Sequence, residues 1–174
     1  MTQTESTADD LSQFVGDWTL NPDQSSVTFR TKAMWVLPVK GTMKALSGEA
    51  HVGADAAVSG SLVLDAASVD TKNKKRDIHL RTKDFFEVET YPTLTFTATG
   101  GRPTGDGEVD VTGELTVHGQ SRPVTLHAKV AVSGNTATLS TQVDIDRSEW
   151  GLKWAKMGSG LKNQVEIEAQ FNRS

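Results

Sequence analysis

Apolar and polar residues alternate along most of the chain, with a period of two residues, between short segments rich in turn-forming residues. In the stretch 109–117, for example, valine and leucine alternate with charged residues and threonine. Such alternation is typical of antiparallel strands that have one face buried and the other in water. The same pattern predicts eight strands, over residues 27–35, 39–52, 58–64, 93–99, 109–117, 124–132, 137–145 and 165–171.

Eight strands with one apolar face each form either a sandwich or a closed barrel. We predict an all-β fold, an eight-stranded antiparallel β-barrel. A barrel of this size is either filled by side chains or holds one small ligand. Several inward positions hold small residues: Gly60, Ala98, Gly113, Ala128, Ala137 and Ala169. Small residues there favour a cavity, although they also suit the taper of a filled barrel.

The chain of 174 residues is the right length for one domain. Residues 1–13 are polar, and we expect them to form a mobile tail. The barrel domain is expected over residues 14–174.

One segment, residues 71–86, interrupts the strand pattern. Thr71 or Asn73 is a suitable N-cap, and Ile78 and Phe85 are seven residues apart, as on one face of a helix. This predicts a short helix between strands, lying across one end of the barrel. Residues 72–84 contain six basic and two acidic residues. They indicate either a solvated helix face or a basic collar for an anionic head group or membrane surface.

The apolar run Ala33–Val39 does not alternate. Either both of its faces are covered, or it forms an exposed apolar lip for a ligand or a membrane. Near the N-terminus, Gly16-Asp17-Trp18 matches the Gly-x-Trp of lipocalin first strands, and Trp18 also suits a plug at a barrel end.

Composition excludes several classes of function. The chain has no cysteine, which excludes disulfides and thiolate chemistry, and its formal net charge is −4, which disfavours nucleic acid as a partner. The four histidines are scattered and indicate no metal site. No stretch of about 20 apolar residues is present. A secretory signal pattern is also lacking, so we expect a cytoplasmic protein.

Longer motifs give a specific resemblance. Asn73, Arg76-Asp77, His79-Leu80-Arg81 and Asp84-Phe85-Phe86 are followed by Tyr91-Pro92-x-Leu94-x-Phe96, then by Gly119-x-x-Arg122-Pro123-Val124, and finally by Asp146-Arg147-Ser148-Glu149-Trp150-Gly151-Leu152. In this order they resemble the signature of the YceI-like family, and the resemblance runs from about Trp18 to Phe171. Ala33 and Met43 depart from it, where members often have histidine and an aromatic residue.

The resemblance implies a lipocalin-like barrel that binds a polyisoprenoid chain or an isoprenoid quinone as ligand, without a cofactor and without catalysis. We expect the tunnel to be lined by Phe29, Trp35, Leu62, Leu94, Phe96, Leu115, Leu126, Leu139 and Val143. Arg76 and His79 are candidates for contacts with the lipid head group at the mouth. Alternatively, Arg76, Asp77 and Arg147 form a structural polar network.

Two other functions remain open at this point. One is an enzyme acting on an apolar substrate through Asp77 and His79, although side chains two apart on a helix do not face each other. The other is a filled barrel whose apolar lip binds a protein partner. Transient contact with a membrane surface is compatible with the lipid carrier. The oligomeric state stays open, a dimer included.

Overall fold

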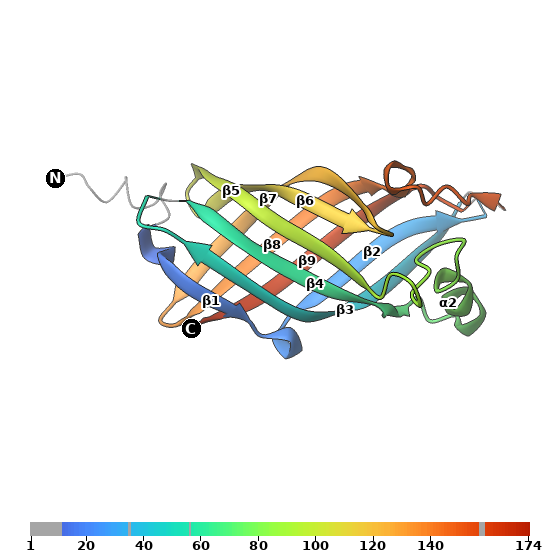
Figure 1. Ribbon diagram of the computed structural model, residues 1–174, viewed down its shortest axis with the longest axis horizontal. Coiled ribbons are helices and arrows are strands. Elements are labelled where there is room, and N and C mark those ends of the chain that lie inside the picture. Colours follow the sequence, from blue (N-terminus) through green and yellow to red (C-terminus); the bar gives the residue numbers. More distant parts are fainter. Residues whose placement is uncertain (1–11, 35, 56, 157–158) are drawn as a thin grey trace.

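The computed structural model of the chain describes residues 12–34, 36–55, 57–156 and 159–174, and antiparallel strands make up most of it (Figure 1). In chain order these are β1 (Gly16–Leu20), β2 (Ser26–Ala33), β3 (Leu37–Val52), β4 (Val58–Asp70), β5 (Thr93–Gly105), β6 (Glu108–Val117), β7 (Gln120–Ser133), β8 (Thr136–Asp146) and β9 (Lys162–Arg173). The α-helix α2 (Lys74–Leu80) lies between β4 and β5. Single 3₁₀ turns are formed by η1 (Ser12–Phe14), η2 (Pro22–Gln24) and η3 (Arg147–Trp150).

The nine strands fill eight positions of a closed barrel. From β3 to β9, each strand pairs with the next one in the chain. The eighth position is shared, because β1 and β2 both pair with β3 on one side and with β9 on the other. β1 lies against the end of β3 at residues 49–52, and β2 lies against its beginning at residues 37–43. The predicted eight-stranded antiparallel β-barrel is therefore confirmed.

The C-terminus and the 3₁₀ turn η1 lie at one end of the barrel, and α2 lies at the other (Figure 1). Trp18 closes the first end from β1. Its side chain is 3% exposed, and its indole N–H donates to the carbonyl of Phe14 at 2.7 Å. The guanidinium of Arg173, at the end of β9, lies 4.2 Å from the Trp18 ring centroid. The Gly-x-Trp motif thus supplies a structural plug.

The small inward residues lie mainly toward this plugged end. Ala128 and Ala137 pack with Phe14 and Trp18 in the largest buried cluster of the described residues. A second cluster holds Ala169. Gly113 is small for a different reason: a Cβ atom there would lie 2.2 Å from the carbonyl oxygen of Thr97 on the neighbouring strand.

The helix α2 covers only Lys74–Leu80 of the predicted segment 71–86, because its capping residues limit it at both ends. Asn73 begins it by accepting the backbone N–H of Arg76 at 3.0 Å, and the helix ends at Leu80. Ile78 is 54% exposed, whereas Phe85 lies beyond the helix in turn structure and is buried. The seven-residue spacing of these two side chains therefore does not reflect one helical face.

The apolar run after β2 forms the tip of the β2–β3 hairpin. Met34, Val36 and Leu37 are 53%, 74% and 52% exposed, and burial resumes at Val39. Of the two interpretations of this run, the described residues fit the exposed lip. Trp35 lies outside the described residues.

Candidate functional site

A cavity of about 590 Å³ extends from the interior of the barrel to the end that carries α2. Its inner walls are apolar, because successive strands turn their inward positions toward it. The expected residues on these walls are Phe29, Leu62, Leu94, Phe96, Leu115, Leu126 and Val143. Ala33 and Met43, the two departures from the family pattern, also line it. Whether these side chains contact a ligand stays a prediction.

A second cavity, of about 150 Å³, lies deeper in the barrel, toward Trp18. Leu139, which was expected on the main wall, lines this cavity instead. The two cavities share four lining side chains: Leu62, Phe96, Leu126 and Ile167. These side chains therefore separate the two spaces.

Strand pairing positions Phe96, one of the four side chains between the two cavities. It pairs with Leu62 of β4 on one side and with Leu115 of β6 on the other. A Cβ atom on Gly113 would lie 2.8 Å from the tip of the Phe96 ring, so the ring occupies space that this glycine leaves open.

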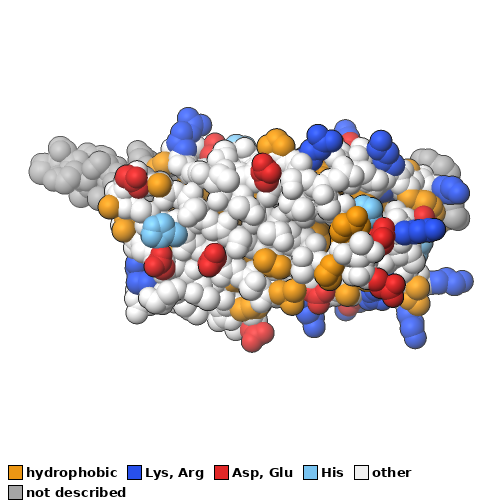
Figure 2. All heavy atoms as spheres, viewed as in Figure 1, with side chains coloured by type: hydrophobic (Ala, Val, Ile, Leu, Met, Phe, Trp, Pro, Cys, Tyr) orange, Lys and Arg blue, Asp and Glu red, His pale blue; other side chains and the backbone are white. Residues whose placement is uncertain are grey.

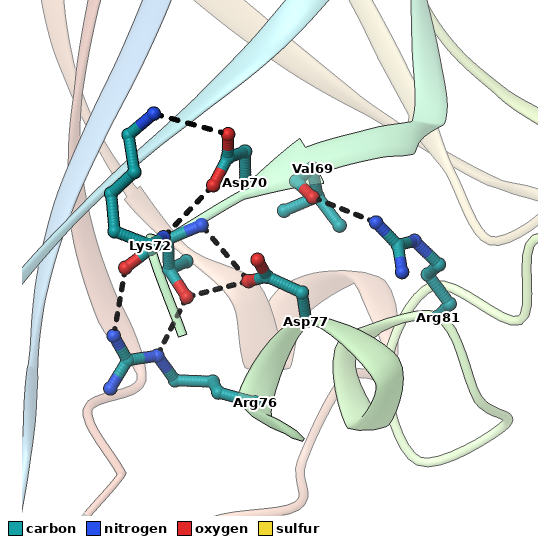
Figure 3. Close-up of polar contacts among 7 residues, drawn as sticks. Val69, Asp70, Lys72, Arg76, Asp77 and Arg81 are labelled. Atoms are coloured by element: carbon teal, nitrogen blue, oxygen red, sulfur yellow. Dashed lines mark hydrogen bonds and ion pairs between the residues drawn. The ribbon is translucent and has the colours of Figure 1, made fainter. Parts of the chain in front are cut away.

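The junction between β4 and α2 forms one side of the cavity mouth (Figure 3). Asp77 points from the helix back to the end of β4, where its Oδ1 accepts the backbone N–H of Thr71 at 2.9 Å and the Thr71 hydroxyl at 2.6 Å. Arg76 donates from Nε to the Thr71 hydroxyl oxygen at 2.8 Å and from Nη2 to the Thr71 carbonyl at 3.0 Å. Thr71 and Asp77 are buried. Asp77 is therefore a structural acceptor.

Two further residues, Lys72 within the junction and Arg81 at the end of α2, contact the end of β4. The backbone N–H of Lys72 donates to Asp70 at 2.9 Å, which lowers the pKa of that carboxyl group. Arg81 donates to the carbonyl of Ala67 at 3.0 Å. It also donates to the carbonyl of Val69 at 3.3 Å (Figure 3). Hydrogen bonds made by the charged side chains of Asp70, Arg76, Asp77 and Arg81 thus hold the junction between β4 and α2 in place.

His79 lies in an aromatic cluster at the mouth. Its ring is edge-on to Trp154 at 4.6 Å and to Phe85 at 5.2 Å between centroids. Its Nε2 lies 2.9 Å from Oδ2 of Asp84. All three rings line the cavity. Sequence reasoning placed His79 here but missed Phe85 and Trp154, although the pairing of Trp150 and Trp154 around one loop was a usable signal.

Arg147 organises the loop that carries Trp154. It donates to the carbonyls of Leu152 at 2.7 Å, Gly160 at 3.0 Å and Ser159 at 3.5 Å. Burial lowers the pKa of its guanidinium, and the charge of Asp146 partly opposes this effect. The expected network of Arg76, Asp77 and Arg147 is therefore two separate networks, since Arg147 bonds to its own loop.

The pair that an enzyme would need is not formed. Asp77 bonds to Thr71, and His79 instead faces Asp84. The other imidazoles also face carboxylates: His51 contacts Asp17, His118 contacts Glu87, and His127 contacts Asp110. His118 and His127 thus each have an acidic partner. Among the described residues, no group of three or more metal-ligating side chains is present.

No helix in the described part of the chain has the length and apolar character needed to cross a membrane.

Comparison with known proteins agrees with the barrel fold described above. The family model described as the YceI-like domain matches residues 18–172. The chain belongs to the YceI-like family. Protein YceI of Escherichia coli O157:H7 is 38% identical over 114 residues, which are 63% of this chain and 58% of that protein. A UPF0312 protein of Vibrio vulnificus is 33% identical over 112 residues, 63% of this chain and 59% of that protein. The aligned part is thus less than two thirds of each relative.

Solved structures share the barrel. BcnA of Burkholderia cenocepacia has a TM-score of 0.79 and 27% sequence identity, covering 87% of this chain and 98% of that one. A polyisoprenoid binding domain from Saccharophagus degradans, implicated in plant cell wall breakdown, has a TM-score of 0.72 and 17% identity, covering 90% and 98%. At that identity the second likeness shows a common fold.

Proposed function

We propose that this YceI-like protein binds an isoprenoid lipid, either a polyprenyl chain or an isoprenoid quinone, and carries or stores it. The observation that supports this most directly is the apolar cavity of about 590 Å³ with polar groups at its mouth. Membership of the YceI-like family and the polyisoprenoid binding described for the Saccharophagus protein support the same ligand class. The cavity also argues against the alternative of a filled barrel.

The tail would lie between the aliphatic and aromatic walls. Each five-carbon unit removed from water stabilises the complex by up to about 4 kcal/mol, at about 0.8 kcal/mol per buried methylene. A charge-assisted hydrogen bond to a head group contributes about 1.5–3 kcal/mol. Retention against water would therefore depend mainly on the tail.

The head group would lie at the mouth, beside Arg76 and His79. Both side chains line the cavity. Arg76 uses Nε and Nη2 to hold Thr71, and within the described residues Nη1 has no protein acceptor. A phosphate or quinone oxygen is a suitable acceptor for this N–H group. Binding needs no catalytic group in this arrangement.

The proposal is tested by native mass spectrometry of the protein purified from cells, followed by extraction and mass measurement of the lipid. We expect a bound mass that corresponds to a polyprenyl compound or a quinone with an isoprenoid tail. A protein that carries no lipid and takes up neither class when both are supplied would contradict the proposal.

Two neighbouring variants on β8 make the test specific to the cavity. Val143→Trp fills the cavity wall and should abolish binding, because Val143 lines the cavity. Gln142→Trp places the same side chain on the exposed face of the same strand and should leave binding intact. Carrier and store are then separated by measuring isoprenoid transfer from donor to acceptor vesicles, which only a carrier accelerates.

A further inference from the structure

The charges of the chain are distributed unevenly between the two ends of the barrel. The described residues around the cavity mouth come mostly from three segments: residues 30–34 and 36–40, residues 71–92, and residues 147–156 and 159–161. They contain twelve of the eighteen basic residues and five of the twenty-two acidic residues, a formal charge of +7. Two of these basic residues, Arg30 and Lys72, pair with Glu166 and Asp70, which lie outside the three segments. The remainder of the chain carries −11. Figure 2 shows lysine and arginine side chains projecting from the end that carries α2.

Most of the acidic side chains at this end already have partners within the protein. Asp77 accepts two hydrogen bonds from Thr71, Asp84 faces His79, and Glu87 faces His118. The lysines differ, because only Lys72 forms an ion pair in the part of the chain that the structure describes. The exposed lysines without one are Lys32, Lys40, Lys74, Lys75, Lys83, Lys153 and Lys156. The positive charge at the mouth therefore faces solvent.

Exposed apolar side chains gather at the same end. Six large apolar side chains are exposed in the described residues, and four of them lie there: Met34, Val36, Leu37 and Ile78. Three form the tip of the β2–β3 hairpin, and the fourth lies on α2. An apolar tip flanked by lysines has the chemistry of a surface that inserts shallowly into an anionic bilayer.

We propose that the mouth end of the barrel docks on anionic lipid bilayers, with the β2–β3 tip in the interface and the lysines on the head groups. This rests on the proposed function, because docking in this orientation opens the cavity directly onto the membrane. A lipid tail then passes between bilayer and barrel without crossing water. The negative remainder of the barrel is repelled by the same surface, which fixes the orientation.

Flotation with vesicles free of isoprenoid lipid measures docking independently of cargo. We expect the wild-type protein to float with vesicles in which about a third of the lipid is phosphatidylglycerol, and not with phosphatidylcholine vesicles. Raising the salt concentration should release it. Equal binding to both vesicle types, or to neither, would overturn the proposal.

Two pairs of variants locate the surface. Lys74→Gln combined with Lys153→Gln should weaken partitioning about 25-fold, since each basic residue near such a surface contributes about fivefold. Lys44→Gln combined with Lys129→Gln, on exposed strand positions away from the mouth, should change it little. Similar losses in both double variants would contradict docking by the mouth.

The apolar contribution has its own matched control. Val36→Ser combined with Leu37→Ser should reduce binding to anionic vesicles severalfold, whereas Leu46→Ser, at an equally exposed position on β3, should not. None of these residues lines the cavity, so uptake of isoprenoid from detergent should stay normal in all variants. A wild-type protein that floats with anionic vesicles but takes up no isoprenoid would contradict the proposed function and leave docking standing. Self-association through the tip without vesicle binding would identify a contact between copies and refute docking.

Discussion

The carboxylate of Asp77 accepts both the backbone N–H and the hydroxyl of Thr71, at 2.9 and 2.6 Å. Both residues are buried, so this contact joins the first turn of α2 to the end of β4 in a place where water cannot replace it. It sets the position of the helix at the cavity mouth and of Arg76 beside it.

Replacing Asp77 should therefore destabilise the fold. Asp77→Ala leaves the Thr71 N–H and hydroxyl without their acceptor, and we expect a loss of about 2–4 kcal/mol in the free energy of unfolding. Asp77→Asn keeps one acceptor oxygen and should lose less. Urea titration checks both variants, with Asp106→Asn at an exposed turn as control. A loss below about 0.5 kcal/mol in Asp77→Ala, as at an ordinary surface site, would show that the contact has little effect.

The strands could be predicted from the sequence because alternation directly reports which face of a sheet is buried. The stretch 109–117 corresponds closely to β6 (Glu108–Val117). The shared position of β1 and β2 could not be predicted, because it depends on pairings with β3 and β9, far away in the chain. The helix was extended too far, since the spacing of Ile78 and Phe85 imitates a helical face although the chain leaves the helix at Leu80.

The cavity walls were predictable for the same reason as the strands. Alternation shows which face of the strand a residue lies on, but not how far along the barrel axis it lies, because that depends on the stagger between strands. Leu139 faces inward as expected but lies in the deeper cavity. The contact of His79 with Trp154, a residue 75 positions later, could not be predicted, because it arises from loop packing with no local periodicity.

The cluster at the mouth should slow the escape of the ligand. Trp154 contacts both His79 and Phe85, and aromatic contacts of this kind contribute about 0.5–1.5 kcal/mol each. Loss of both contacts, about 1–3 kcal/mol together, should therefore raise the dissociation rate of a bound isoprenoid in Trp154→Ala about fivefold to 150-fold. Stopped-flow transfer to excess acceptor vesicles measures this rate. Tyr91→Ala removes a ring that packs at a tilt against His118 and does not line the cavity, so the dissociation rate should remain that of the wild type.

Stability should fall in acid in part through Asp146, the cap of η3. Hydrogen bonds from the Ser148 hydroxyl at 2.6 Å and backbone N–H at 3.0 Å lower the pKa of this carboxyl group. Because this pKa is lower in the folded state than in the unfolded state, the ionised carboxylate contributes to the free energy of unfolding at pH values above the unfolded pKa, about 3.9. The contribution is lost as the pH falls from there through the folded pKa.

Asp146→Asn should therefore lower the urea midpoint at pH 7 and flatten its dependence on pH below about 5. Asp144→Asn, at an exposed position two residues earlier on β8, is the matched control and should keep the wild-type profile. Parallel pH profiles for wild type and Asp146→Asn would show that this cap does not contribute to acid unfolding.

Phe96 should set the length of isoprenoid that the barrel accepts. It is one of four side chains between the cavities of about 590 and 150 Å³, and the largest of the four. Phe96→Ala should join the two spaces, so that the longest chain retained in native mass spectrometry increases by at least one isoprene unit. The same change should reduce stability by about 3 kcal/mol, because it enlarges an interior void. Leu94→Ala also enlarges the main cavity but lies outside the partition, so it should leave the length limit unchanged. If both variants shift the limit equally, total volume and not the partition at Phe96 determines which lipid is held.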